Sequence, residues 1–339
     1  MSRPHVVITT IQAPTASVRA LQRRLVALGD GVEGAAGLLI VGDHKGPSGY
    51  DVDASELLTI DSQRELPFGL ARLLPEGHYC RKNLGYLVAQ HRGSPWIYET
   101  DDDNAPLPSW QPRSLHVSAG AIDVGGWLNV YQLYSDELIW PRGFPLASIR
   151  NDGQPTGELA VASARTVEAP IQQGLANGAA DVDAIWRLVL DRDIVFRDGP
   201  SVVLEPRTWC PFNSQSTWWW PSAYALMYLP SYCSFRMTDI WRSFIAQRCV
   251  WEMGHGIVFH NAEVLQERNV HDLMRDFRDE LPGYTRNEEL VTELESLKLD
   301  AGASTVVSNL RRCYRHLVEL EFFPHRELEL VEAWIADLP

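Results

Sequence analysis

The sequence is poor in cysteine, and its few cysteines form no recognisable framework. Five cysteines occur in 339 residues, an odd number, and no two of them make a Cys-x-x-Cys pair. Neither a disulfide scaffold nor a structural zinc site is therefore indicated. We expect a reduced, cytoplasmic setting for this chain.

Long apolar runs are also missing. No stretch approaches the roughly 20 apolar residues that a membrane-spanning helix needs, and the aromatic cluster Trp218–Trp220 is closed by Pro221. The chain passes from Ser-Arg-Pro directly into the short apolar run His5–Thr10, without the pattern of an export signal. We expect no membrane span.

Basic residues are fewer than acidic residues. Lys and Arg number 30 against 44 Asp and Glu, which gives a net charge of −14. This balance argues against nucleic acid or an anionic membrane as a partner, because both need a broad basic surface. An anionic ligand would have to be held locally, by a metal ion or by a few placed cations. With 45% hydrophobic residues, the chain has ample material for a packed core.

The first hundred residues alternate between strand and helix patterns. Strands are predicted over His5–Thr10 and Gly37–Gly42, with a helix over Ser17–Leu28 between them. The pattern continues with a strand over Glu56–Ile60, a helix over Asn83–His91 and a strand over Pro95–Tyr98. Parallel strands joined by helices bind ligands at their carboxyl ends, so the loops after these strands are candidate sites.

Beyond about Asn104 the pattern loosens into segments rich in Pro, Gly and Trp. Here we predict a short strand over Trp127–Leu133, helices over Asp239–Gln247, Asp272–Phe277 and Thr305–Leu320, and a solvated helix face over Glu288–Asp300.

Three consecutive carboxylates, Asp101, Asp102 and Asp103, follow the strand that contains Trp96. Carboxylates about 5 Å apart repel by about 3 kcal/mol at an effective dielectric near 20, so a partly buried cluster favours a bound cation. Mg²⁺ and Mn²⁺ prefer such hard oxygen ligands and are commonly completed by phosphates. Asp101 and Asp103 lie on the same side of an extended segment and are the better pair of ligands. A helix N-cap or a solvated acidic turn explains the cluster equally well.

Short motifs occur in order over roughly residues 5 to 260. They are Val6–Ile11, Ile40–Asp43, Arg81–Tyr86, Ile97–Asn104, Trp140–Pro145, Ile171–Gly178, Cys210–Gln215, Thr238–Arg242 and Gln247–Arg248. These blocks resemble the STELLO glycosyltransferase family. More distantly, the same order of blocks is similar to the reversibly glycosylated polypeptides, which are UDP-arabinopyranose mutases.

The resemblance implies an α/β fold of the Rossmann-like GT-A type, with a mixed central sheet and a helical C-terminal extension. The expected parts are a nucleotide-binding half over 1–104, a half for donor sugar and acceptor over 105–265, and the extension over 266–339. In this family an Asp-x-Asp type motif holds a divalent metal on the diphosphate of a nucleotide sugar, a role that maps onto Asp101–Asp103. An Asp after an early strand faces the base, which maps onto Asp43 with Thr9 and Thr10.

Three basic residues are candidates for the donor. Arg81 and Lys82 stand just before a predicted helix and could hold phosphate, or could equally form surface ion pairs. In the mutases the arginine of the matching block becomes glycosylated, so Arg142 could line the donor sugar. A turn arginine packed on Trp140 is the structural alternative.

Two acidic residues are candidates for work on the acceptor. Asp239 opens a predicted helix, so it could cap that helix or could orient or deprotonate an acceptor hydroxyl. Glu252 is a second-choice base.

Late in the chain, His255 and His260 are candidate metal ligands, because GT-A metals commonly gain a late histidine. A structural role for each histidine is the alternative. Asn213 and Gln215 offer amides for sugar hydroxyls. Trp218–Trp220 could stack on a sugar, although at least two of these rings are expected in the core.

The sequence and this resemblance thus predict a metal-dependent (Mn²⁺ or Mg²⁺) glycosyltransferase that moves a sugar from a nucleoside diphosphate to an unidentified hydroxyl acceptor, with UDP as the expected nucleotide. A UDP-sugar mutase that glycosylates itself is one alternative. A non-catalytic scaffold that binds nucleotide sugars is the other.

Overall fold

The computed structural model describes residues 3–29, 36–149, 161–267 and 272–339. Its strands are β1 (His5–Thr9), β2 (Gly37–Val41), β3 (Ser55–Leu58), β4 (Ile97–Thr100), β5 (Asn104–Pro106), β6 (His116–Ile122), β7 (Gly126–Trp127), β8 (Arg165–Glu168), β9 (Ile171–Gly178), β10 (Val202–Leu204), β11 (Thr208–Trp209), β12 (Ser216–Trp219) and β13 (Ile257–Gln266).

The α-helices are α1 (Ala16–Gly29), α2 (Ile60–Arg64), α3 (Gly69–Leu73), α4 (Lys82–His91), α5 (Tyr131–Tyr134), α6 (Leu146–Ile149), α7 (Ala184–Val189), α8 (Thr238–Glu252), α9 (Leu273–Ser296), α10 (Val306–Glu319) and α11 (Glu327–Ala336). Short 3₁₀ turns at Tyr79–Arg81, Pro221–Met227, Phe235–Met237 and Ala303–Thr305 connect several of them.

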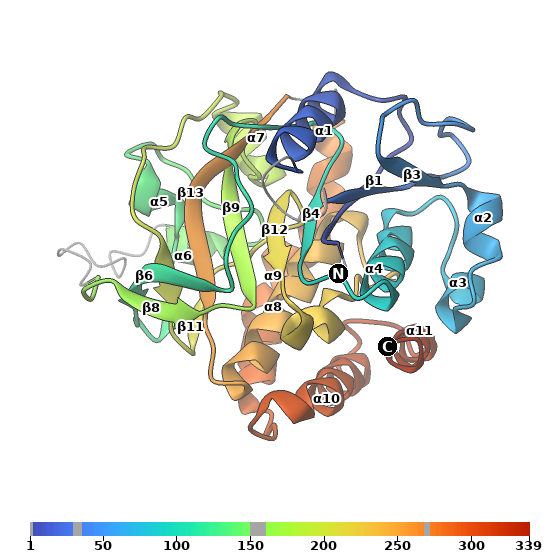
Figure 1. The fold of residues 1–339 in the computed structure, drawn as a ribbon. Coiled ribbons are helices and arrows are strands. Elements are labelled where there is room, and N and C mark those ends of the chain that lie inside the picture. Colours follow the sequence, from blue (N-terminus) through green and yellow to red (C-terminus); the bar gives the residue numbers. More distant parts are fainter. Residues whose placement is uncertain (1–2, 30–35, 150–160, 268–271) are drawn as a thin grey trace.

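One mixed sheet runs through the described residues in the order β3-β2-β1-β4-β12-β9-β13-β10-β6-β8, and β5 pairs with β13 (Figure 1). Apolar side chains alternate along β1 to serve both faces of this sheet. Val7 packs in the larger core cluster with Leu84 and Leu87 of α4. Val6 and Ile8 pack in a second cluster on the other face. The sheet therefore lies between two apolar layers.

Strand direction decides where a site can form. Strands β1 to β4 are parallel to one another. Strand β12 is antiparallel to both β4 and β9, and β9 is parallel to β13. The carboxyl ends of β1, β4, β9 and β13 and the amino end of β12 therefore meet at one edge of the sheet.

A largely buried helix and the C-terminal helices support the sheet from one side. The first fourteen residues of α8 are all buried, and α10 packs against α8 while α11 packs against α3 (Figure 1). No helix in the described ranges is long and apolar enough to cross a membrane.

The predicted α/β class of GT-A type, with a mixed sheet and a helical C-terminal extension, agrees with this architecture. The first three predicted strands, the two helices between residues 17 and 91, and the helix over Thr305–Leu320 are confirmed to within two residues at each end. The two proposed halves share one sheet, and their boundaries stay a prediction.

Several predicted elements need correction. The strand expected over Pro95–Tyr98 begins and ends two residues later, as β4, and the segment Trp127–Leu133 contains only the end of β7 and the start of α5. The helices expected over Asp239–Gln247 and Asp272–Phe277 extend to Glu252 and Ser296. The face expected to be solvated over Glu288–Asp300 buries Leu290, Val291 and Leu294, so only part of it is solvated.

Candidate active site

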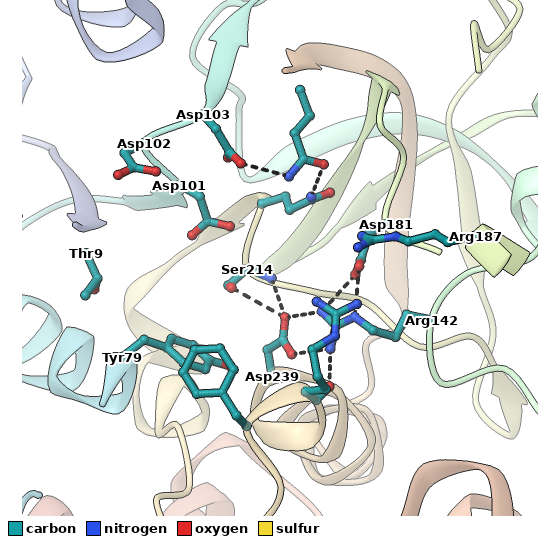
Figure 2. Close-up of a pocket in the computed structure, with 14 residues that line it drawn as sticks. Thr9, Tyr79, Asp101, Asp102, Asp103, Arg142, Asp181, Arg187, Ser214 and Asp239 are labelled. Carbon is teal, nitrogen blue, oxygen red and sulfur yellow. Dashed lines mark hydrogen bonds and ion pairs between the residues drawn. The ribbon is translucent and has the colours of Figure 1, made fainter. Parts of the chain in front are cut away.

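A cavity of about 290 Å³ opens at the edge where these strand ends meet (Figure 2). It is lined by Thr9, Tyr79, Asp101, Asp102, Asp103, Arg142, Asp181, Arg187, Ser214, Gln215, Phe235, Arg236, Asp239 and Gln266. The lining comes from the ends of β1, β4 and β13, from the loops after β9 and before β12, and from the start of α8. Segments far apart in the sequence thus build one site.

The three consecutive aspartates at the end of β4 are each held by a different partner. Asp101 Oδ1 lies 3.0 Å from Nζ of Lys82, whose side chain is fully buried. Asp102 accepts a short hydrogen bond from the Thr10 hydroxyl. Asp103 accepts from Gln266 Nε2 at 3.2 Å. Their side chains therefore diverge, although all three line the cavity.

Electrostatics disfavour negative charge on this cluster in the absence of a ligand. Burial raises the pKa of Asp101 to about 7, in opposition to Lys82, and the charges of Asp103 and Asp102 add to the increase. Burial also raises the pKa of Asp102, against the hydrogen bond from Thr10. A cation at Asp101 and Asp103 would relieve this repulsion.

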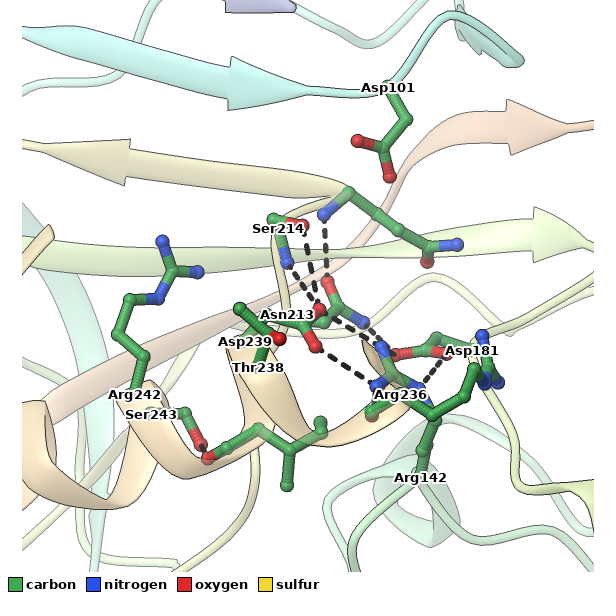
Figure 3. Close-up of polar contacts among 12 residues, drawn as sticks. Asp101, Arg142, Asp181, Asn213, Ser214, Arg236, Thr238, Asp239, Arg242 and Ser243 are labelled. Carbon is green, nitrogen blue, oxygen red and sulfur yellow. Dashed lines mark hydrogen bonds and ion pairs between the residues drawn. The ribbon is translucent and has the colours of Figure 1, made fainter. Parts of the chain in front are cut away.

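A buried arginine with two carboxylates forms another wall of the cavity (Figure 3). Arg142 donates from Nε and Nη2 to Asp181, at 2.8 and 2.9 Å. It also donates from Nη1 and Nη2 to Asp239, at 2.9 Å each. A further short hydrogen bond from Nη1 reaches the carbonyl of Arg236. All five N–H groups of this guanidinium are therefore engaged.

Asp239 is strongly held as an anion. Burial alone would raise its pKa, but the ion pair with Arg142 and the nearby Arg242 and Arg236 lower the pKa to about 2. Asp239 is the second residue of α8, and Met237 occupies the N-cap position, so the predicted cap is wrong. A carboxylate with so low a pKa is a weak proton acceptor, and hydrogen bonding to a ligand suits it better.

Many of the predicted site residues do come together here. Those that line the cavity are Thr9, Asp101, Asp102, Asp103, Arg142, Gln215 and Asp239. Thr10, Lys82 and Asn213 lie directly behind this lining: Thr10 and Lys82 hold aspartates, and Asn213 Nδ2 donates to Asp181 at 2.8 Å.

Three predicted residues lie elsewhere. Asp43 accepts hydrogen bonds from the backbone N–H of Gly77 and lines a separate hollow beside α2. Arg81 does not reach the cavity, because its guanidinium donates to Gln63 and to the carbonyl of Leu74. Glu252, at the last turn of α8, pairs with Arg248 at 2.6 Å. The structure therefore does not bring these three residues to the cavity that the aspartates line.

Neither predicted histidine ligand lines the cavity. Both ring nitrogens of buried His260 are engaged, with Ser201 Oγ at 2.6 Å and Gln172 Oε1 at 2.9 Å. His255 lies 3.7 Å from Glu168. His260 is thus held by protein side chains, as its structural alternative predicts, and the structure brings neither histidine to the aspartates.

The described residues contain no group of three or more His, Cys, Asp or Glu side chains placed to hold a metal ion. Two carboxylates, Asp101 and Asp103, do line the cavity together. That set fits Mg²⁺ or Mn²⁺, which keep several waters and complete their shell with phosphate oxygens.

The prediction that at least two of the rings of Trp218–Trp220 lie in the core is confirmed. Trp218 and Trp219 are fully buried, Trp220 is 6% exposed, and none of the three lines the cavity. Tyr79 and Phe235 line it instead, as an edge-to-face pair with ring centroids 4.8 Å apart.

Sequence reasoning missed several lining residues. Asp181 follows β9, and parallel pairing of β9 with β13 brings it to the site. Gln172 and Gln173 make the sequence of β9 polar, so the hydrophobic pattern did not predict this strand. Arg187, Arg236 and Gln266 lie outside every block quoted above, and Ser214 lies inside one without a role assigned to it. Only the order of the strands could have found them.

Comparison with known proteins finds similarity to one glycosyltransferase family. Residues 236–339 match the model of the STELLO glycosyltransferases. The chain is 28% identical over 237 residues to Probable glycosyltransferase STELLO1 of Arabidopsis thaliana, covering 64% of this chain and 30% of that protein. It is 24% identical over 328 residues to Probable glycosyltransferase STELLO2 of the same plant, covering 89% and 41%. The chain is thus similar to the STELLO glycosyltransferases, and its matches span only 30% and 41% of the length of these two relatives.

Among solved structures, the chain matches glucosyl-3-phosphoglycerate synthase from Mycobacterium tuberculosis in complex with phosphoglyceric acid. The TM-score is 0.39 at 11% identity, covering 83% of this chain and 80% of that one. A mycobacterial protein matches with a TM-score of 0.37 at 10% identity, covering 86% and 73%. These are distant likenesses.

Proposed function

We propose that this protein is a glycosyltransferase that moves a sugar from a nucleoside diphosphate donor, UDP by preference, to a hydroxyl acceptor. The observation that carries the proposal is the shared cavity, which joins the aspartates after β4 to the Arg142 cluster. Its place at the carboxyl ends of parallel strands is where α/β sheets bind nucleotides. The names of the STELLO relatives support the same activity.

In this proposal Asp101 and Asp103 hold a divalent cation, Mn²⁺ or Mg²⁺, against the diphosphate. The bound cation would neutralise the charge that develops on the departing nucleoside diphosphate. Lys82 keeps Asp101 in place from behind, through its ion pair and a hydrogen bond of 2.8 Å to the carbonyl of Thr100.

The other lining residues orient the donor. Thr9 Oγ1 is buried and makes no hydrogen bond with any residue that the structure describes, so it has spare capacity for a ligand at the cavity. Tyr79 and Phe235 offer ring surfaces to the base or the sugar.

Arg142 and Asp239 act as a positioned pair in this scheme. Asp239 Oδ2 also lies 3.3 Å from the backbone nitrogen of Ser214, so both the helix start and the loop before β12 fix it. Held in this way, the carboxylate can accept a hydrogen bond from an acceptor or sugar hydroxyl. It orients that hydroxyl without taking its proton while the pair with Arg142 is intact.

The surroundings of Arg142 argue against the mutase alternative, in which this residue would carry the sugar. Arg142 is 6% exposed, and its five N–H groups are engaged. A sugar on this guanidinium would have to break two buried ion pairs, which is costly. A self-glycosylating mutase would need another residue.

Thermal unfolding with UDP and UDP-sugars, with and without Mn²⁺, tests the proposal. A ligand that binds the folded state stabilises it by about 2.7 kcal/mol at a hundredfold excess over its Kd. We expect a gain that needs both diphosphate and metal. The double variant Asp101→Asn, Asp103→Asn should abolish it, whereas Asp136→Asn, at a side chain that is 85% exposed, should keep it.

Release of UDP in the presence of hydroxyl acceptors then separates an enzyme from a scaffold. An enzyme releases UDP and forms a glycosylated acceptor. Binding without release across a broad acceptor panel would favour the scaffold. Absence of any metal-dependent stabilisation would reject the nucleotide-sugar site itself.

A further inference from the structure

Three arginines, Arg142, Arg187 and Arg236, line the same cavity as the aspartates. In Figure 2, Arg142 and Arg187 lie on the side of the cavity away from Thr9 and Asp102. The cavity therefore has a cluster of carboxylates at one end and a cluster of guanidinium groups at the other.

The neighbours of buried Arg187 compensate its positive charge only weakly, through one contact of 3.5 Å with a carboxylate. It lies on α7 and is only 7% exposed. Its one hydrogen bond to a described residue runs from Nη1 to Asp276 Oδ2, at 3.5 Å. Its Nε and Nη2 groups make none. Burial lowers the pKa of Arg187, and the charge of Arg236 lowers it further. A buried guanidinium with unused donors is costly unless a ligand completes it.

Arg236 has a partner but retains unused capacity. Its Nε donates to Glu280 Oε1 at 2.9 Å, and Nη2 lies 2.9 Å from the same oxygen without a hydrogen bond of acceptable geometry. The other oxygen of Glu280 accepts from the backbone N–H of Ala184 and from the Tyr284 hydroxyl. Glu280 is thus divided among several donors.

The two carboxylates in the segment just before α7 are already committed to other groups. Asp181 accepts two hydrogen bonds from Arg142 and one from Asn213. Asp183 accepts from the indole N–H of Trp140 and from the backbone N–H of Trp186. Neither carboxylate accepts a hydrogen bond from Arg187, whose one carboxylate partner among the described residues is Asp276.

We infer that Arg187, assisted by Arg236, binds a negatively charged group of the substrate, a carboxylate or a phosphate. This inference rests on the proposed function, since the diphosphate occupies the aspartate end of the cavity. The planar fork of arginine matches the paired oxygens of either anion. A neutral hydroxyl would supply a hydrogen bond, but it would add no negative charge beyond that of Asp276, whose ion pair with Arg187 is long at 3.5 Å. The substrate class is therefore anionic beyond the diphosphate.

The anion can come from the donor sugar or from the acceptor. Paired probes distinguish these sources: UDP-glucuronate against UDP-glucose for the donor, and glycerol 3-phosphate against glycerol for the acceptor. Affinities are measured by calorimetry with Mn²⁺, the acceptor pair both with and without UDP. In at least one pair, the wild-type protein should prefer the charged probe by roughly tenfold to a hundredfold.

The decisive variant is Arg187→Gln, which should lose this preference while binding UDP as the wild type does. Arg187→Lys keeps the charge without the fork and should restore part of the preference. Arg192→Gln is the matched control, because Arg192 lies in the neighbouring loop with a side chain that is 45% exposed, and it should retain the full preference. Thermal unfolding of each variant checks that the fold is intact.

The outcomes separate this inference from the proposed function. Wild-type protein that binds UDP without preferring either charged probe overturns the inference alone. An Arg187→Gln protein that folds and keeps the preference overturns it as well. A preference for the anion without UDP binding supports the arginine site and rejects the nucleotide-sugar function.

Discussion

Arg142 donates hydrogen bonds to Asp239 from both of its terminal nitrogens, each 2.9 Å from a different carboxylate oxygen. The two residues are 97 positions apart in the sequence, and the contact ties the loop before α6 to the start of α8. Since Asp181 binds the adjacent edge of the same guanidinium, through Nε and Nη2, one buried arginine fixes two segments of the cavity wall.

Removing this arginine should destabilise the protein strongly. Arg142→Met leaves two carboxylates buried without their cation, and breaking a buried pair in this way typically costs about 3–5 kcal/mol. Arg142→Lys retains the charge but cannot reach both carboxylates as a fork, so its loss should be smaller. Urea denaturation of the wild type and of the two variants measures the order of their stabilities. A loss below about 1 kcal/mol for Arg142→Met would contradict the role given to this cluster.

The residue after Arg142 should be equally intolerant of change. Gly143 has φ +88°, and a Cβ there would lie 2.4 Å from Cγ2 of Ile240. Gly143→Ala therefore combines backbone strain with a clash and should lower the free energy of unfolding by about 1–3 kcal/mol.

Two other glycines serve as controls for this measurement. Gly77 has φ +73° with open space around its Cβ position, so Gly77→Ala reports strain without a clash. Gly49 has open space and no positive φ, so Gly49→Ala should leave stability nearly unchanged. Equal losses at Gly143 and Gly77 would show that the contact with Ile240 is unimportant.

Stability should fall in acid in part because of His5. Burial, reinforced by Arg3 and Arg92, lowers the pKa of His5 to about 4. Between pH 6.5 and 4 the imidazole of His5 is therefore protonated in the unfolded chain to a greater extent than in the native protein. The stabilising contribution is complete above pH 6.5 and is lost as the pH falls, by on the order of 3 kcal/mol at pH 4.

The variant His5→Gln removes this titration. Its free energy of unfolding should depend less steeply on pH between 6.5 and 4 than that of the wild type, whatever its absolute stability. His325→Gln, at an exposed histidine, is the control and should follow the wild-type curve. Parallel curves for His5→Gln and wild type would mean that His5 is not the group responsible.

Sequence patterns found those parts of the fold that local forces determine. The β-branched run at β1 and the apolar spacing of α10 are visible without any partner, and the aspartates after β4 mark the site. By contrast, Gln173 is buried in β9 because Asn213, Thr217 and the carbonyl of Ser216 satisfy its amide. Such pairing depends on tertiary neighbours, so the strand and Asp181 beyond it could not be predicted.

The same reason explains the misplaced site residues. Arg81 and His260 have the right chemistry for phosphate and metal, but protein groups already engage them: Gln63 and the carbonyl of Leu74 for the arginine, and Ser201 and Gln172 for the histidine. Whether a polar side chain is free for a ligand depends on what packs around it, and a single sequence does not specify that.

Phe235 should matter for ligand binding more than for stability. Its ring is 50% exposed at the cavity and packs edge-to-face on Tyr79. If this pair contacts the base of the donor, Phe235→Ala should weaken UDP affinity by about 1–3 kcal/mol, the usual value of base stacking on an aromatic ring. Calorimetry with UDP and Mn²⁺ measures the change. Val26→Ala, at a side chain on α1 that is 44% exposed, controls for the loss of exposed apolar surface. Unchanged affinity in Phe235→Ala, together with loss of binding in the Asp101 and Asp103 variant, would place the base away from this ring while leaving the diphosphate site intact.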